Sequence, residues 1–264
     1  MVSAGAGEEL SVLPRAPEFR VDGKRALVTG ASRGIGFATA VALAQAGAAV
    51  TLVARNEAGL HEACSALRAE GLQCDAIALD VTDSHAVNAR IGQAGPFQIL
   101  VNNAGMNRPK ELVHLEDEDI DAVLDLNVKA AFYVTRVVTR QLLAAGLSGS
   151  VINVSSQMGL VGSPRRTLYC ASKHAIEGMT KALAWELGPA GIRVNTLCPT
   201  FIETAMTAGM FADASFREWV TSRIALGRLG RVEEIMGAVL FLASDASSLV
   251  TGSALMLDGG WTAA

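Results

Sequence analysis

The sequence has few cysteines and histidines and no cluster of positive charge. Its four cysteines, Cys64, Cys74, Cys170 and Cys198, are scattered, with no Cys-x-x-Cys pair and no histidine at metal-ligand spacing. This pattern predicts reduced thiols, a cytoplasmic location and no metal site. The formal net charge is −4 and no basic block is present, which argues against nucleic acid or an anionic membrane as a partner.

No apolar run is long enough to cross a membrane, which needs about 20 residues. The most apolar window, 37–54, is interrupted by Gln45 and Gly47, and is more consistent with a helix end, a turn and a buried strand. Residues 1–20 contain no apolar signal-peptide segment, so we expect a mobile tail. Residues 21–264 are predicted to form a single domain, because no linker or repeat divides them.

Strand-like and helix-like segments alternate from residue 24 onward. The segments expected to form strands are 25–30, 49–54, 74–80, 97–105, 149–156, 192–199 and 253–260. Helical patterns lie between them, including a long amphipathic one at 117–145, whereas the stretch after residue 199 is less regular. This order predicts an α/β fold with one doubly wound, Rossmann-like parallel sheet of about seven strands and helices on both faces. Ligands should bind beyond the carboxyl ends of the strands.

Three glycines, Gly30, Gly34 and Gly36, lie in the segment TGASRGIG, where the first strand gives way to a helix. Such a turn needs glycine where φ is positive or where the backbone approaches a ligand. The helix N-terminus then offers free N–H groups to a pyrophosphate. Any tight turn could use these glycines, but their place after the first strand of an alternating array favours nucleotide binding.

The segment LYCASKHAIEG places Tyr169 and Lys173 four residues apart, on one face of a predicted helix. A free phenol has a pKa of about 10, too high for efficient proton transfer near neutral pH. A nearby ammonium stabilises the phenolate and lowers that pKa. The pair could therefore be an acid/base group beside a nicotinamide, or simply a semi-buried tyrosine next to a lysine that extends to solvent.

The glycine spacing G-x-x-x-G-x-G resembles the classical short-chain dehydrogenase/reductase family, whose motif TGxxxGxG is matched at 29–36. Further matches, in the family's order, are NNAG at 102–105, Asn127, SSQMG with Ser156, YCASK at 169–173, IRVNTLCP at 192–199 and DGG at 258–260. Segment 227–261 is similar to that of gluconate 5-dehydrogenases. A 3-oxoacyl-carrier-protein reductase is the main enzymatic alternative, and a nucleotide-binding protein without turnover is the alternative of another class.

The resemblance implies roles for four residues. Tyr169 would be the general acid/base, Ser156 would orient the carbonyl, Lys173 would lower the phenol pKa and bind the nicotinamide ribose, and Asn127 would complete a proton relay. Ser156 precedes Tyr169 by 13 residues, which is the family's spacing, whereas Ser155 is better suited to turn hydrogen bonding. Asn127 lies on the apolar stripe of the predicted long helix, so its amide should be buried and hydrogen-bonded. A cap or a helix distortion would also explain it.

We expect NADP(H) to be preferred over NAD(H). Arg55 stands at the end of the second strand, where NAD sites of this architecture usually carry a carboxylate, and Arg33 lies in the glycine loop. Two guanidiniums suit a 2′-phosphate. Both could instead be solvated surface residues, and Glu57 lies only two positions beyond Arg55.

The resemblance also implies the complete set of cofactor contacts. These are Gly30, Ser32, Arg33, Gly34, Ile35, Gly36, Arg55, Asp80, Val81, Asn103, Ala104, Gly105, Tyr169, Lys173, Pro199, Ile202 and Thr204. Asp80 could equally cap a turn. Thr200 replaces a glycine that many family members have after the proline, so the backbone there is expected to be stiffer.

The expected substrate is a small, polar carbonyl or alcohol compound, with a keto acid or sugar acid as the favoured class. The implied pocket residues are Asn107, Arg108, Gln157, Met158, Arg165 and Arg166, with Met206, Met210 and Phe211 in a lid. The three arginines could bind a carboxylate or could be exposed loop residues. Small residues on the helix of Tyr169, together with the family's pairing of helices 117–145 and 167–187, predict a homotetramer.

Overall fold

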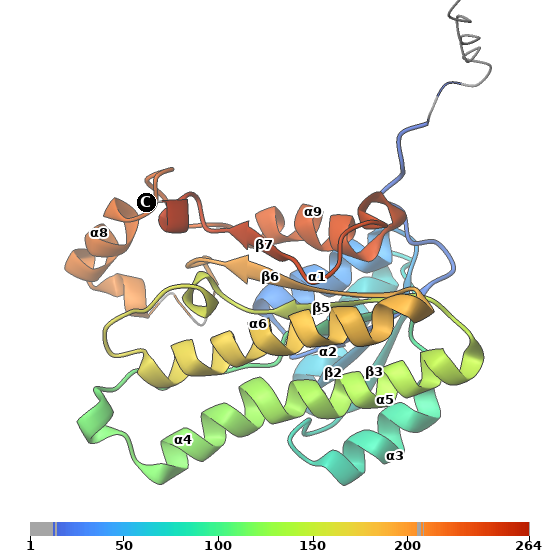
Figure 1. Cartoon of the computed structure of the whole chain (residues 1–264), viewed down its shortest axis with the longest axis horizontal. Helices are drawn as coiled ribbons and strands as arrows, with labels where there is room; N and C mark the ends of the chain where they lie inside the picture. Colours follow the sequence, from blue (N-terminus) through green and yellow to red (C-terminus); the bar gives the residue numbers. More distant parts are fainter. Residues whose placement is uncertain (1–12, 14, 205–206, 208, 264) are drawn as a thin grey trace, which may run out of the picture.

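The computed structural model describes residues 13, 15–204, 207 and 209–263, so most of the predicted tail lies outside the described residues. Its centre is one parallel sheet in the order β3-β2-β1-β4-β5-β6-β7, which confirms the predicted fold class (Figure 1). The strands are β1 (Arg25–Thr29), β2 (Ala49–Ala54), β3 (Cys74–Ala78), β4 (Ile99–Asn102), β5 (Gly149–Val154), β6 (Ile192–Pro199) and β7 (Ala254–Leu257). In register, Leu27 of β1 pairs with Thr51 of β2 and Leu100 of β4.

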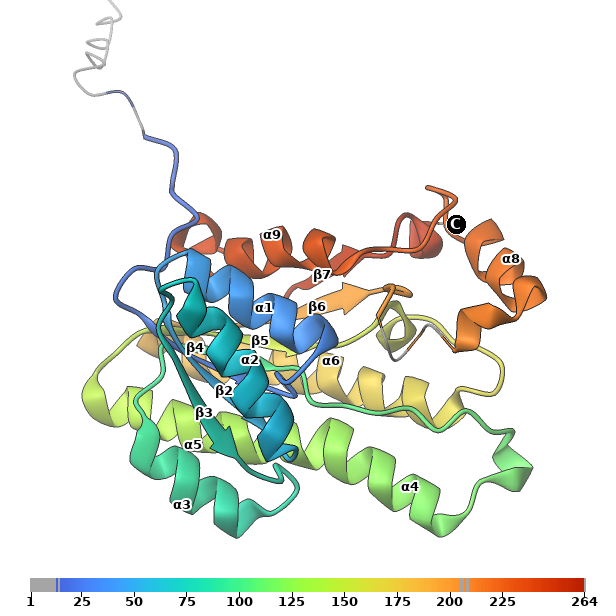
Figure 2. The same ribbon diagram turned by 180° about the vertical axis from the view of Figure 1, so that it is seen from behind.

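Helices cover both faces of the sheet (Figures 1 and 2). One face carries α1 (Gly34–Gln45), α2 (Glu57–Ala69) and α9 (Val232–Ala243), and the other carries α3 (Ser84–Ala94), α5 (Ala130–Ala145) and α6 (Thr167–Leu187). The segment α4 (Asp117–Leu124) precedes α5 and extends beyond the sheet (Figure 1). Successive strand side chains point to opposite faces. Ala26 and Val28 of β1 accordingly join the apolar cluster under the first set of helices, whereas Leu27 joins the other cluster. Burial on both sides explains why the strands are continuously apolar.

The predicted long helix at 117–145 is present, but it is not α-helical throughout. A π-helical turn, η2 (Asp125–Lys129), separates α4 from α5, because the side chain of Asn127 is held by residues outside the helix. The irregular stretch after β6 also contains a helix, α8 (Ala214–Ser222), whose first turn is capped by Asp213. Short 3-10 turns are η1 (Leu112–His114), η3 (Gln157–Gly159), η4 (Gly188–Ala190), η5 (Met210–Ala212), η6 (Asp245–Ser247) and η7 (Trp261–Ala263). Among the described residues, no helix is long and apolar enough to span a membrane.

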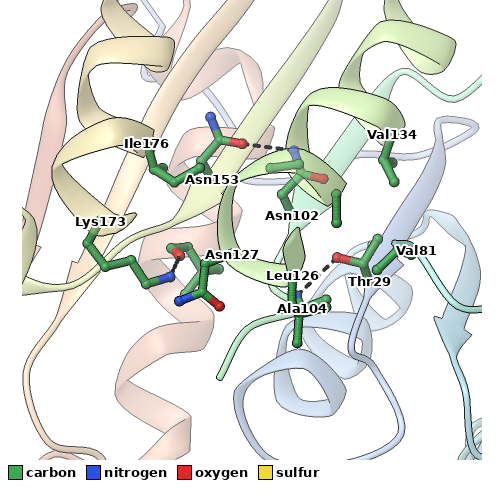
Figure 3. Close-up of a pocket in the computed structure, with 13 residues that line it drawn as sticks. Thr29, Val81, Asn102, Ala104, Leu126, Asn127, Val134, Asn153, Lys173 and Ile176 are labelled. Atoms are coloured by element: carbon green, nitrogen blue, oxygen red, sulfur yellow. Dashed lines mark hydrogen bonds between the residues drawn. The ribbon is translucent and has the colours of Figure 1, made fainter. Parts of the chain in front are cut away.

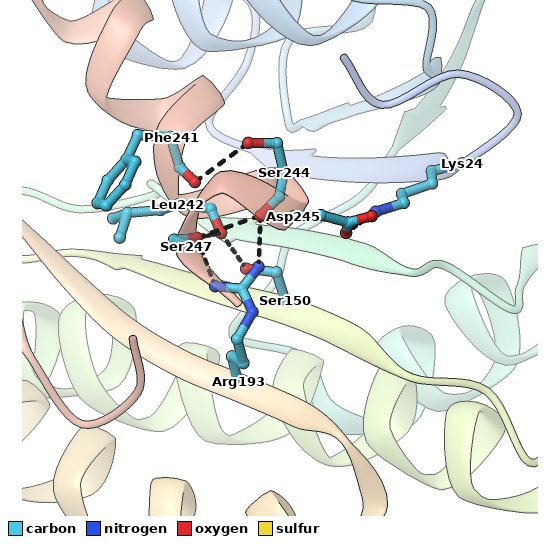
Figure 4. A network of polar contacts seen from close by, with 8 residues as sticks. All are labelled: Lys24, Ser150, Arg193, Phe241, Leu242, Ser244, Asp245 and Ser247. Atoms are coloured by element: carbon cyan, nitrogen blue, oxygen red, sulfur yellow. Dashed lines mark hydrogen bonds and ion pairs between the residues drawn. The ribbon is translucent and has the colours of Figure 1, made fainter. Parts of the chain in front are cut away.

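A polar network closes the amino end of β6, away from the carboxyl ends of the strands (Figure 4). The Arg193 guanidinium donates to Ser247 Oγ at 2.7 Å and to the Ser244 carbonyl oxygen at 3.1 Å. Ser150 Oγ of β5 donates to the Leu242 carbonyl oxygen at 2.8 Å. The last carbonyls of α9 are thus satisfied by two strands of the sheet, which fixes this helix on its face.

Candidate active site

A cleft of about 1,060 Å³ opens at the carboxyl ends of the strands. Among the described residues, every predicted catalytic and cofactor residue except Asn127 lines it: Gly30, Ser32, Arg33, Gly34, Ile35, Gly36, Arg55, Asp80, Val81, Asn103, Ala104, Gly105, Ser156, Tyr169, Lys173, Pro199, Ile202 and Thr204. The sequence reasoning did not single out other lining residues, such as Asn56, Glu62, Leu126, Phe201 and Thr207. Asn56 and Phe201 come two residues after the ends of β2 and β6, and that position was the available signal.

The glycine loop is shaped by close backbone approach. Gly30 and Gly34 have positive φ, at 65° and 58°, and a Cβ on Gly36 would collide with Asn103 Nδ2 and with the Gly30 carbonyl oxygen. Asn103 Nδ2 donates to the carbonyl oxygens of Thr29 and Gly30 at 3.0 and 3.1 Å. Thr29 Oγ1 accepts from the backbone N–H groups of Asn103 and Ala104. The NNAG segment therefore holds the glycine loop in place.

The N-terminus of α1 is chemically suited to an anion. The N-cap residue, Arg33, makes no side-chain capping bond, and the first turn contains no acidic residue. The first backbone N–H groups of the helix are therefore left for an external acceptor. Gly34, Ile35 and Gly36 border the cleft at this point, so the residues present fit a dinucleotide pyrophosphate.

Arg33 and Arg55 both line this cleft, after β1 and β2 respectively, and both are largely exposed. Arg55 Nη1 lies 3.8 Å from Asp80 Oδ2, and Asp80 Oδ1 accepts from the Thr82 N–H and hydroxyl at 3.0 and 2.7 Å. Burial favours a higher pKa for Asp80, but the bonds from Thr82 and the charge of Arg55 outweigh it, so the pKa is lowered. Asp80 therefore caps a turn and also lines the cleft.

The predicted catalytic side chains converge on the middle of the cleft. Lys173 Nζ donates to the Val154 carbonyl oxygen at 2.8 Å and lies 5.6 Å from the centre of the Tyr169 ring. Ser156 Oγ donates to Gln157 Oε1 at 3.0 Å and accepts from the Met158 N–H at 3.1 Å. The fold thus brings β5, its following loop and α6 together, as the sequence predicts.

The pKa values differ from the predicted pattern. Burial raises the pKa of the Tyr169 phenol to about 12, with a hydrogen-bond interaction to Ser156 opposing it. Burial lowers the pKa of Lys173 to about 8, although Cys198 and Glu177 oppose this. The expected lowering of the phenol pKa by Lys173 is therefore not produced by the polypeptide alone, because the ammonium bonds to a backbone carbonyl and burial disfavours both charged forms.

Asn127 does not line the cleft but borders a separate small cavity, together with Lys173 and Asn102 (Figure 3). Its side chain is 3% exposed, accepts from the Met106 N–H at 2.8 Å, and donates to the Met106 carbonyl oxygen and to Ser172 Oγ at 2.9 and 3.0 Å. Both expectations hold, since this amide is buried and bonded and also lies in a helix distortion. A cavity of about 10 Å³, with room for about one water, is lined by Asn127, Lys173 and Asn102. Asn102 Oδ1 has no partner among the described residues.

The predicted substrate pocket is only partly formed by the residues expected. Asn107, Gln157, Met158, Arg166 and Met210 line the cleft, whereas Met206 lies outside the described residues.

The three predicted rim arginines are placed differently. Arg108 pairs with Asp119 at 2.8 Å and Arg165 is exposed, so of these three described arginines only Arg166 borders the cleft. Phe211 packs 5.8 Å from Phe201, ring to ring, behind the cleft wall. A carboxylate site built on three arginines is therefore wrong for this structure, and Arg166 remains.

Comparison with known proteins shows which family the chain belongs to. A family model described as enoyl-(acyl carrier protein) reductase matches residues 30–262. The gluconate 5-dehydrogenase of Gluconobacter oxydans is 41% identical over 248 residues, which cover 92% of this chain and 96% of the relative. The chain belongs to the classical short-chain dehydrogenase/reductase family. As a member of this family, it is a dehydrogenase/reductase that acts on CH–OH groups.

Two further short-chain dehydrogenases/reductases illustrate the range of similarity. The 3-oxoacyl-[acyl-carrier-protein] reductase of Thermotoga maritima is 43% identical over 248 residues, 92% of this chain and 99% of the relative. The crystal structure of a gluconate 5-dehydrogenase from Burkholderia cenocepacia, in complex with NADP and tartrate, has a TM-score of 0.90 at 38% identity. That match covers 93% of this chain and 98% of the other. Both resemblances drawn from the sequence are confirmed.

Proposed function

We propose that this protein is an NADP(H)-dependent oxidoreductase that interconverts a ketone and a secondary alcohol on a small sugar or sugar acid. Residues 21–264 would form its one catalytic domain. The observation that carries the substrate class is Arg166, a half-buried guanidinium at the cleft, near Tyr169. Within the described part of the chain it has no side-chain hydrogen bond or ion pair, so it is available to a carboxylate or a polyol.

In the proposed mechanism, the Tyr169 hydroxyl donates a proton to the substrate oxygen during reduction and recovers it from the alcohol during oxidation. The Ser156 hydroxyl, which bonds to Gln157 in this structure, turns to the substrate oxygen and orients it. Lys173 and Asn127 both line the small cavity, where one water would connect the ammonium to the Asn127 side chain. NADP(H), when bound, supplies or accepts the hydride, and its oxidised ring adds a positive charge that favours the phenolate.

The cofactor preference rests on charge. The N-terminus of α1 would bind the pyrophosphate, and Arg33 and Arg55 would flank the 2′-phosphate. Asp80 and Val81 would contact the adenine, and Ile202 and Thr204 the nicotinamide half. The similar gluconate 5-dehydrogenase that was crystallised with NADP supports this preference.

The substrate class is tested with a panel of keto acids, oxidised sugar acids and neutral sugars of equal size. Arg166→Met should raise KM for the acids about tenfold, because a charge-assisted bond is lost, and leave the neutral sugars unchanged. Arg165→Met, at the exposed neighbour, is the matched control. Equal effects of Arg166→Met on acids and neutral sugars would remove the proposed carboxylate contact.

A 3-oxoacyl-carrier-protein reductase is the second candidate, favoured by the Thermotoga maritima relative at 43% identity. The same panel should therefore include a 3-oxoacyl thioester. A thioester that outperforms every sugar acid in kcat/KM would select this candidate.

We also propose a homotetramer. The small residues Ala171, Ala175, Gly178 and Ala182 are all exposed on α6, so they are not explained by packing within the subunit. Phe132 of the neighbouring α5 is 49% exposed. Both helices could pair with a second copy. Light scattering at micromolar concentration should give four subunits, and a monomer would end this proposal.

A further inference from the structure

A buried acid lies one helical turn beyond Lys173 on α6. Glu177 is 4% exposed and Lys173 is 5% exposed. Glu177 Oε2 accepts from Thr196 Oγ1 at 2.9 Å, and Oε1 accepts from Cys198 Sγ at 3.3 Å. Both donors belong to β6, so the carboxylate joins the catalytic helix to the sheet.

The same carboxylate lies against the loop that carries Ser156. A Cβ on Gly159 would be 2.7 Å from Ser155 Oγ and 3.3 Å from Glu177 Oε1, so both side chains press on this glycine. Ser155 Oγ has no hydrogen-bond partner among the described residues. Glu177 therefore contacts both β6 and the loop after β5. It lies on α6, which carries Tyr169 and Lys173, and against the loop that carries Ser156.

The donors around Glu177 suit a negative charge. Each oxygen accepts a hydrogen bond, and burial raises the pKa of Cys198 to about 12, so its thiol stays neutral and can donate. Neutral donors alone leave a buried charge uncompensated. The titratable groups on the surrounding elements are Tyr169 and Lys173 on α6 and Cys198 on β6, while the loop offers the hydroxyls of Ser155 and Ser156. Lys173, at i−4 on the same face, is the cation among them.

We propose that Glu177 is a positioning residue, the buried counter-charge that keeps Lys173 protonated and holds the Ser156 loop against α6. The negative charge of Glu177 opposes the burial that lowers the pKa of Lys173. The inference rests on the proposed acid/base roles of Tyr169 and Lys173. Glu177 would be a third buried ionisable group beside Tyr169 and Lys173, and it would not touch the substrate.

The test is the pH dependence of kcat for carbonyl reduction in Glu177→Gln, an isosteric change that removes the charge. Loss of a buried negative charge lowers the pKa of Lys173, and the proposed reduction needs its ammonium beside Tyr169. The alkaline limb of the profile should therefore move to lower pH by about one unit. Activity should fall much less on the acidic side of the profile than on the alkaline side.

Two variants make the result specific. Glu186→Gln, at an exposed position of the same helix, should leave the alkaline limb where it is in the unmodified protein. Glu177→Asp keeps the charge but moves it away from Lys173. The alkaline limb of its pH profile should therefore fall between the limbs of the unmodified protein and of Glu177→Gln. If Glu177→Gln does not fold, the shift of the alkaline limb in Glu177→Asp tests the proposal instead. If a Glu177 variant had a lower melting temperature but an unchanged alkaline limb, Glu177 would have a purely structural role, and the proposal would be wrong.

A second readout needs no turnover. The chain has two tyrosines, so in a Tyr133→Phe background the absorbance of tyrosinate reports Tyr169 alone. Adding Glu177→Gln should make tyrosinate appear at lower pH, by about one unit. An unchanged titration would contradict the proposal. If the unmodified protein reduces no carbonyl compound, the proposed function fails, whereas this titration still measures the charge effect of Glu177.

Discussion

Replacing Gly36 with alanine should damage cofactor binding, because the added methyl group has no room in the glycine loop. The new Cβ would meet Asn103 Nδ2 and the carbonyl of Gly30, with the Gly30 carbonyl carbon at 2.9 Å. Asn103 would have to move and would lose its bonds to the Thr29 and Gly30 carbonyl oxygens, at 3.0 and 3.1 Å. Each bond contributes about 1 kcal/mol, and overpacking costs a further ~1–3 kcal/mol.

Alanine gains back about 1 kcal/mol of helix propensity over glycine. The free energy of unfolding should therefore fall by roughly 2–4 kcal/mol. Because the displaced groups shape the proposed pyrophosphate site, the Kd for NADPH should rise at least about tenfold, as expected for the loss of one charge-assisted bond. Urea denaturation and NADPH fluorescence measure the two effects separately.

Gly92→Ala on α3 is the matched control, because nothing lies within 4 Å of its added Cβ. It should stabilise the protein slightly, by about 0.4–1 kcal/mol, and leave NADPH binding unchanged. If Gly36→Ala behaved like Gly92→Ala, the close approach of Asn103 and Gly30 could not be what requires glycine here.

Two further substitutions test the charge at the cofactor site and the network at the far end of the sheet. Arg55→Asp should lower kcat/KM with NADPH by about 10- to 100-fold and change NADH only a few-fold, because attraction at the 2′-phosphate becomes repulsion; comparable kcat/KM for both cofactors in the unmodified protein would refute the preference. Arg193→Met breaks the bonds to Ser247 and Ser244 and should cost about 2–3 kcal/mol of unfolding free energy. Arg217→Met, in an exposed pair with Glu203, should cost less than about 1 kcal/mol, and equal losses would contradict the account of the Arg193 network.

The sheet and its order of elements were predictable because each strand is a short apolar run and each turn carries a local signal. The helix at 117–145 was predictable too, but its π-helical turn was only one of the readings open for Asn127, since the turn depends on Asn127 meeting Met106 and Ser172, which are distant in sequence. Only the folded chain places them at one point. Helix α8 was missed although Phe216, Trp219 and Val220 follow helical spacing, because a helix of 9 residues gives only a short signal.

The candidate site divides in the same way. The roles expected of Ser156, Tyr169 and Lys173 come from the resemblance to the family, which short motifs and the spacing between them carry. The electrostatics do not, because the pKa of Tyr169 is raised by burial, and burial is a property of the whole fold. Arg108 also shows what the sequence could not predict. Its guanidinium pairs with Asp119 of α4, and this contact forms only when the loop of Arg108 folds against that helix.

Tyr169→Phe tests the central claim most directly. This change removes the phenolic proton and keeps the ring, so turnover of the best carbonyl substrate should fall by about 100-fold or more. The Kd for NADPH should stay within about twofold, because the ring and Lys173 still form the cleft wall. Substantial residual turnover with intact cofactor binding would mean that another group donates the proton, and the assignment of Tyr169 would be wrong.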